Sequence, residues 1–187
     1  MEVVSPSSSS PTQEKKEKTV VSKGIQVDAE TWFYVIHEYL RNLFENPDKD
    51  EDAKYAGIES LASVMGKNII EACTDDRLVK YKSTKDILFF IGNEVWTYLF
   101  NKKISNIIAK EEGQELYLFI DEDFHFLRRL SPEDDRSKEY VSFCTSFIAR
   151  LLKSMVRAFQ IEPEILAETP DYIEYDFTIH IKAPPPS

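Results

Sequence analysis

The sequence predicts an α+β domain in which a layer of about four helices packs on a mainly antiparallel four-stranded sheet. Two observations carry this prediction: apolar residues recur at helical spacing through most of the chain, and they alternate with polar residues near its C-terminus. The 187 residues, 42% of them hydrophobic, suffice for one core. We therefore expect a single domain over residues 25–183, between a disordered N-terminal tail at 1–24 and a C-terminal tail at 184–187.

The first two helices are predicted from a cap and from apolar stripes. Asp28 can cap a helix that runs to about Glu45, whose stripe is wide enough for one edge to meet a partner. A second helix covers roughly Ala53–Cys73 and contains Gly66. Because glycine within a helix costs about 1 kcal/mol relative to alanine, we expect another helix to approach closely there.

A capping motif predicts the third helix. Ser83 and Asp86 have the spacing of a capping box and open a helix over about Lys85–Phe100, which is apolar on all sides and therefore expected at the centre of the core. We expect a short helical extension to Ala109. A regular apolar stripe predicts a last long helix over about Ser137–Phe159.

Short apolar runs predict the strands. Leu116–Ile120 and Phe124–Leu127 flank three acidic residues and predict a β-hairpin with its turn at Asp121–Asp123. Glu164–Glu168 is a weak strand candidate. The alternating segment Tyr172–Lys182 predicts a strand with one buried face and one wet face.

Composition limits the classes of function. The net charge of −10 makes the chain a poor general binder of nucleic acid, because phosphate is repelled. The N-terminus shows no apolar signal sequence, and no apolar run reaches the roughly 20 residues of a membrane span, so we expect a cytoplasmic protein. Cys73 and Cys144 lack a paired spacing and are interpreted as buried free thiols.

Recognisable catalytic and metal-binding patterns are missing from the sequence. It contains no glycine-rich phosphate loop, and the histidines His37, His125 and His180 lack the spacing of metal ligands. No pair of nucleophile and base stands out. We therefore expect no catalytic residues, no metal and no cofactor, and a protein that acts by binding other proteins.

One acidic pattern resembles a calcium-binding loop. Asp48, Asp50, Asp52 and Glu59 occupy the first, third, fifth and twelfth positions of an EF-hand, but Ala53 stands where that loop needs glycine. We favour a solvated acidic loop over a calcium site.

A basic stripe has two interpretations. Arg150, Lys153 and Arg157 share one face of the last predicted helix. They form either a contact for an acidic partner or membrane surface, or ordinary solvated cations near a helix C-terminus. We favour the solvated cations.

Motifs along most of the chain resemble, in order and spacing, the small subunits of the transport protein particle (TRAPP) family. The segment Ile58–Glu71 resembles the glycine-containing helix of that family, and Asp86–Phe100 resembles the next helix. His37, Phe100–Ile107 and Tyr117–Asp121 resemble the subunit six type, the yeast 33-kilodalton class. The motif residues are Gly66, Ile69, Ile70, Glu71, Trp96, Phe100, Lys102, Ile104 and Asn106.

Some positions depart from the subunit six pattern. Ala62 stands where a second glycine is usual, and Ala149 with Arg150 replaces an Arg-Gly pair. Pro132, the pair Ser142-Phe143 and the pattern within 95–100 look more like the subunit five type, which is the second choice.

The resemblance implies the α/β plait of the small TRAPP subunits. Such subunits pair through their first helices with a related small subunit, here one of the three type, and the pairs join end to end. It also implies a non-catalytic core subunit of a vesicle-tethering complex. That complex is a guanine-nucleotide exchange factor for Rab GTPases in ER-to-Golgi and intra-Golgi traffic. The chain would then be peripheral at the cis-Golgi and endoplasmic reticulum, with membrane contact only through the complex.

The expected dimer face combines the first two helices. Its candidate residues are Phe33, Ile36, His37, Leu40, Leu61 and Val64. Two alternatives stay open at this point: an acyl- or lipid-binding module, since buried aromatic helices could enclose a channel, and, as the weakest, a small enzyme.

Overall fold

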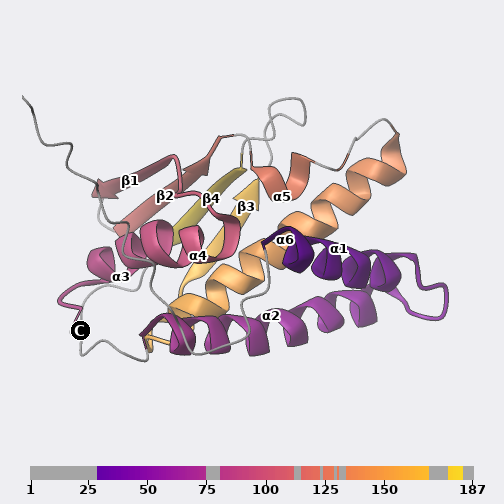
Figure 1. Cartoon of the computed structure of the whole chain (residues 1–187), viewed down its shortest axis with the longest axis horizontal. Helices are drawn as coiled ribbons and strands as arrows, with labels where there is room; N and C mark the ends of the chain where they lie inside the picture. The colour runs from indigo at the N-terminus through magenta and orange to yellow at the C-terminus, as the bar shows by residue number, and fades with distance from the viewer. Residues whose placement is uncertain are drawn as a thin grey trace, which may run out of the picture.

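The computed structural model describes most of the predicted domain. The described residues are 29–74, 81–111, 115–122, 124–128, 130, 134–168 and 177–182. The two predicted tails, Asp28 and residues 172–176 of the last predicted strand lie outside them. Within this part of the chain, helices pack on one side of a four-stranded antiparallel sheet with the strand order β1-β2-β4-β3 (Figure 1). The predicted α+β class and the antiparallel sheet are therefore confirmed.

The described elements follow the predicted order, with two exceptions discussed below. They are α1 (Ala29–Glu45), α2 (Glu51–Thr74), α3 (Thr84–Phe90), the π-helix η1 (Ile91–Val95), α4 (Trp96–Phe100), β1 (Asn106–Glu111), β2 (Glu115–Asp121), α5 (His125–Arg128), α6 (Asp135–Arg157), β3 (Glu164–Glu168) and β4 (Phe177–Lys182).

The acidic loop before α2 serves as a helix cap. The Oδ1 atom of Asp50 accepts a hydrogen bond from the Ala53 amide at 2.8 Å, which satisfies one of the free donors at the start of α2. Glu59, the twelfth position of the supposed calcium loop, lies two turns into α2 and pairs with Arg150 of α6 at 3.0 Å. Among the described residues no group of three or more acidic, histidine or cysteine side chains could hold a metal ion.

The glycine within α2 marks the crossing of α2 and α6. A Cβ atom at Gly66 would lie 2.6 Å from Cβ of Ser154 and 3.0 Å from the backbone oxygen of Leu151. The Ser154 hydroxyl donates a hydrogen bond to the Ser63 carbonyl at 2.9 Å, so the two helices also bond where they cross. The predicted close approach of another helix at Gly66 is confirmed.

We expect Gly66→Ala to destabilise the fold by about 2 kcal/mol, because the overpacking cost exceeds the gain in helix propensity. Denaturant unfolding measures this difference. Gly57→Ala is the matched control: its added Cβ would meet only the flexible end of Leu43, at 2.8 Å from Cδ2, and should change stability little. Equal effects of the two substitutions would contradict this account of the crossing.

The predicted helical extension to Ala109 is wrong. Asn101 ends α4 in the left-handed conformation, with φ of 54°, and its amide donates to the Thr97 carbonyl. The Gly92 carbonyl, within the π-helix η1, accepts a hydrogen bond from the Ile104 amide at 3.1 Å. The chain therefore doubles back along η1 and enters β1, where residues from Asn106 pair with β2 instead of continuing a helix.

The predicted hairpin partner of Leu116–Ile120 is also wrong. Its partner is β1, which precedes it in the chain, and residues 125–127 belong to the short helix α5. Phe124, Phe126 and Leu127 are all buried, while His125 between them is exposed. In a strand Leu127 would lie on the same exposed face as His125, whereas a turn of helix allows all three apolar side chains to be buried.

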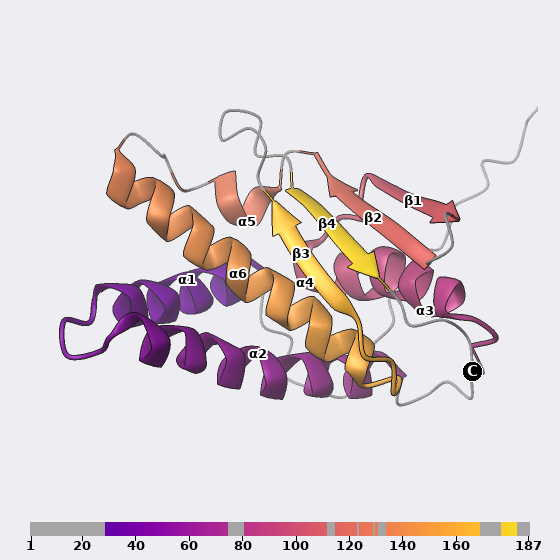
Figure 2. The ribbon, with the colours of Figure 1, turned by 180° about the vertical axis from the view of Figure 1, so that it is seen from behind.

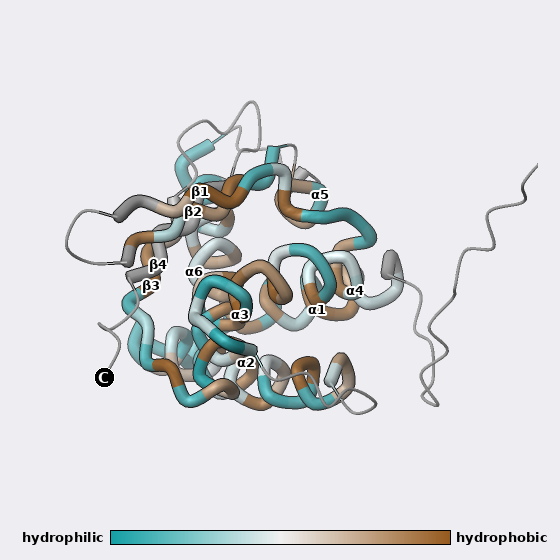
Figure 3. The backbone as a smooth tube through the Cα atoms, turned by 90° about the vertical axis from the view of Figure 1, so that its left-hand side faces the viewer, coloured by the Kyte–Doolittle hydropathy of each residue, from teal (hydrophilic) through white to brown (hydrophobic). Residues whose placement is uncertain are grey.

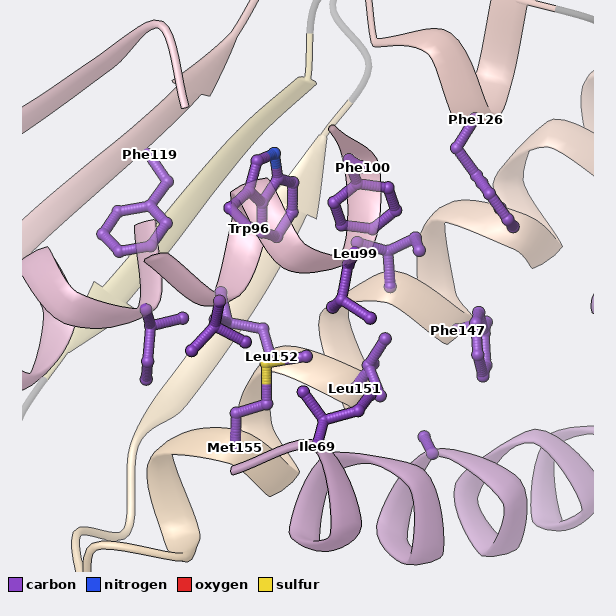
Figure 4. Close-up of a cluster of buried hydrophobic side chains, with 14 of the residues drawn as sticks. Ile69, Trp96, Leu99, Phe100, Phe119, Phe126, Phe147, Leu151, Leu152 and Met155 are labelled. Atoms are coloured by element: carbon purple, nitrogen blue, oxygen red, sulfur yellow. The ribbon is translucent and has the colours of Figure 1, made fainter. Parts of the chain in front are cut away.

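The core lies between the sheet and the helices. Figure 4 shows Trp96, Phe100 and Phe119 pointing into this space from α4 and β2, above Leu151 and Leu152 of α6. The Trp96 and Phe100 rings lie 4.5 Å apart between centroids, and further rings from α1 and α5 join them. The aromatic side chains therefore contact one another in the core. Within the described residues, no helix is long and apolar enough to cross a membrane.

Candidate partner-binding surface

The first helix leaves one apolar edge uncovered. Its core face includes Leu40 and Leu43, which are buried in the chain itself. Val35 and Tyr39, one turn apart and in line with Leu43, are 57% and 44% exposed. One edge of α1 thus carries exposed apolar side chains within the described chain.

The second helix, α2, carries a row of residues that lies beside the exposed edge of α1. Gly57, Leu61 and Val64 share one face of α2 at helical spacing. Leu61 is half-buried and Val64 is 60% exposed. The contact between Gly57 and Leu43 places this row beside the row of α1, and α1 and α2 lie side by side in Figures 1 and 2. We call Val35, Tyr39, Leu61 and Val64 the α1–α2 patch.

The predicted dimer-face residues divide between core and surface. Phe33, Ile36 and Leu40 are buried within the chain, which leaves little of their side chains for a partner to contact. His37 is partly buried: its Nε2 lies 2.7 Å from the Phe126 carbonyl oxygen and its ring stacks on Phe126. Leu61 and Val64 belong to the α1–α2 patch. Sequence reasoning missed Val35 and Tyr39, although their spacing to Leu43 was a usable signal.

A buried acidic residue of β2 bonds to α4 and to the segment that follows it. Asp121, at the end of β2, is buried and accepts a hydrogen bond from Nε1 of Trp96 at 2.6 Å. Its other carboxylate oxygen forms an ion pair with Lys102, whose ammonium also donates to the Glu122 carbonyl at 2.6 Å. Burial raises the pKa of Asp121, and Lys102 and Trp96 oppose that rise.

Comparison with known proteins gives a family for this arrangement. The family model described as transport protein particle (TRAPP) component matches residues 32–184. The chain belongs to the TRAPP family. The curated relatives found are of the subunit six type, as the sequence motifs predicted, and they are named as components of a trafficking complex.

The individual relatives of this TRAPP chain are distant. Trafficking protein particle complex subunit 6B of Mus musculus is 27% identical over 124 residues, which cover 64% of this chain and 74% of the relative. Subunit 6B of Homo sapiens is 25% identical with the same coverage. A solved subunit 3 from Naegleria fowleri, described as covalently bound to palmitic acid, has a TM-score of 0.62 at 12% identity and covers 84% of this chain and 93% of its own. It supports the fold.

Most of the residues of the TRAPP motifs are buried or pair with another residue of the chain. Gly66, Ile69 and Ile70 are buried in α2, while Glu71 lies on its surface beside Lys67. Trp96, Phe100 and Ile104 are buried in the core. Lys102 pairs with Asp121, and Asn106 begins β1. Most of these positions therefore contribute to the packing of the chain itself.

The basic stripe is paired within the chain. Arg157 of α6 donates to Glu162 through Nε, with 2.8 Å to Oε2, and Lys153 lies 3.8 Å from the same carboxylate. Arg150 pairs with Glu59 of α2. These cations therefore connect α6 to α2 and to the segment before β3, as part of a solvated surface.

Cys144 is a buried thiol. It is completely buried in α6, and burial raises the pKa of its thiol to about 12. The thiolate, which is the nucleophilic form, is therefore disfavoured at pH 8. We expect iodoacetamide to leave Cys144 of the native protein unmodified, as mass spectrometry of its peptides can show. Rapid native modification of Cys144, at the rate seen in denaturant, would contradict this and favour the acyl-binding alternative.

Proposed function

We propose that this TRAPP subunit is a non-catalytic core subunit that pairs, through the α1–α2 patch, with a related small TRAPP subunit of the three type. In this proposal it supports assembly of a Rab guanine-nucleotide exchange factor that tethers vesicles in ER-to-Golgi and intra-Golgi traffic. The protein would be cytoplasmic and peripheral at the cis-Golgi and endoplasmic reticulum, reaching the membrane only through its complex.

The exposed apolar side chains of the α1–α2 patch carry this proposal. Large apolar side chains that are about half exposed on two adjacent helices gain free energy when a partner removes them from water. Hydrogen bonds fix the position of α1 on α5 and α6: the His37 ring contacts the Phe126 carbonyl, and the Tyr140 hydroxyl donates to the His37 carbonyl. An apolar patch on two adjacent helices is suited to a helix-on-helix contact with a similar subunit.

Affinity purification of the tagged full chain from native cells tests this proposal. We expect small TRAPP subunits to be recovered in stoichiometric amounts, together with exchange activity towards a Rab GTPase in the eluate. The isolated chain should have no such activity. Recovery of the chain without any other TRAPP subunit would contradict the proposal.

A further inference from the structure

A short apolar stretch precedes the first helix of the TRAPP domain. It lies outside the described residues, and it also lies outside the match to the TRAPP family model, which begins at residue 32. Residues 5–18 contain no hydrophobic side chain, whereas residues 20–27, which we call the pre-α1 segment, contain four. These four are Val20, Val21, Ile25 and Val27.

The pre-α1 segment is joined to the chain close to the α1–α2 patch. The helix α1 starts at Ala29, and Val35 lies six residues later, which is about 9 Å along the helix axis. Eight residues in extended form span about 26 Å, which is also the length of a helix of 17 residues such as α1. Figure 3 shows α1 beside α2, with the strands on the other side of the molecule. A reversal of the chain at Asp28, a residue type that favours turns, would therefore lay the segment along these helices.

The α1–α2 patch offers this segment an apolar surface. Val35, Tyr39 and Val64 are 57%, 44% and 60% exposed. Contact with the valine and isoleucine side chains of the pre-α1 segment would remove apolar area of both surfaces from water. The free energy gained is proportional to the apolar area that is buried.

Charge favours the same contact. Residues 1–24 contain four lysines and three glutamates, a net charge of +1, so the rest of the chain carries −11 of the total of −10. Lys23 belongs to the pre-α1 segment. Glu38, which follows Val35 by one turn of α1, is exposed and lies 3.8 Å from Arg41. The segment would thus bring a positive charge to an acidic part of the chain.

We propose that the pre-α1 segment covers the α1–α2 patch of the unpaired subunit, and that the related small TRAPP subunit displaces it on binding. This inference rests on the proposed function of the patch. Because the segment is joined directly to α1, its effective concentration at the patch is in the millimolar range. A weak contact, with a Kd of about 0.1 mM for the separate peptide, therefore suffices to cover the patch about 90% of the time and to weaken pairing about tenfold.

Limited trypsin digestion of the full chain tests this contact, because Lys23 lies inside the segment and Lys15 outside it. We expect initial cleavage after Lys23 to be about tenfold slower in the unmodified chain than in the Val35→Asp, Val64→Asp double variant. Cleavage after Lys15 should be equal in the two, as mass spectrometry of the released peptides can show. Leu166→Asp, a change at an equally exposed apolar residue of the sheet, is the matched control and should keep Lys23 protected.

A variant of the segment tests the competition with a partner. Val21→Ser combined with Ile25→Ser should remove the protection of Lys23 and strengthen binding of a small TRAPP subunit about tenfold, as titration calorimetry measures. Val3→Ser combined with Val4→Ser makes a similar change outside the segment and should alter neither quantity.

The outcomes separate this proposal from the proposed function. Cleavage after Lys23 at the same rate in the unmodified chain and in the Val35, Val64 variant would overturn the contact. Unchanged partner affinity in the Val21, Ile25 variant would overturn the displacement. The digestion contains no partner, so a chain that pairs with no small TRAPP subunit would still show protection that depends on the patch. Normal pairing by a chain whose Lys23 is unprotected would leave the proposed function standing.

Discussion

Val35→Asp combined with Val64→Asp is expected to abolish pairing with a small TRAPP subunit of the three type while leaving the fold intact. Both side chains are more than half exposed, so the substitutions cost the isolated chain little. In a pair, each carboxylate would lose its water inside an apolar contact, and affinity should fall by about a hundredfold or more. Co-expression followed by affinity purification and titration calorimetry measures this loss.

Two further substitutions serve as controls for that result. Leu166→Asp makes the same change at an equally exposed apolar residue of the sheet and should leave the pairing intact. Ile36→Asp places a charge in the core, where Ile36 is buried, and should unfold the chain, so a loss of pairing in that variant says nothing about the surface. Normal pairing by the Val35 and Val64 double variant would refute the assignment of the patch.

Lys102→Met is expected to destabilise the fold by about 3 kcal/mol at pH 7, because it leaves the buried Asp121 carboxylate without its cation. The hydrogen bond from Trp96 remains but does not balance the charge. Urea unfolding of the variant and of the unmodified chain gives the difference. A change under about 0.5 kcal/mol, the size typical of a surface pair, would show that the carboxylate is not isolated from water.

The stability that Lys102→Met loses should be smaller at lower pH. Burial already raises the pKa of Asp121, and removing Lys102 removes the main opposing influence, so the pKa rises further. The folded variant then binds a proton that the unfolded chain does not, and its free energy of unfolding increases as pH falls towards the folded pKa. The deficit relative to the unmodified chain should therefore be smaller at pH 5 than at pH 7.

A second variant tests whether the lost stability comes from the unpaired charge of Asp121. Adding Asp121→Asn to Lys102→Met removes the buried negative charge and keeps an oxygen that can accept from Trp96. We expect this double variant to recover a large part of the lost stability and to lose the extra pH dependence. An equally unstable double variant would show that Lys102 acts by packing alone.

The long helices were predictable because each carries its own signal. The stripe of α6 and the cap of α3 depend only on residues three to four apart, and the Ser83 hydroxyl indeed accepts from the Asp86 amide. The segments that failed, Asn106–Glu111 and Phe124–Leu127, are short apolar runs whose local pattern fits both helix and strand. Their states were set by a partner strand and by burial under α1, which local spacing does not encode.

Spacing within single elements was enough to predict the α+β class, the order of the helices, the close approach at Gly66 and the motifs that resemble TRAPP. Which apolar residues of α1 and α2 are exposed depends on the packing of the whole chain. Phe33, Ile36 and Leu40 are as apolar as Val35 and Val64, and burial against the rest of the chain separates the two sets. The pairing of Lys102 with Asp121 likewise joins residues far apart in sequence, through a contact that no periodicity reveals.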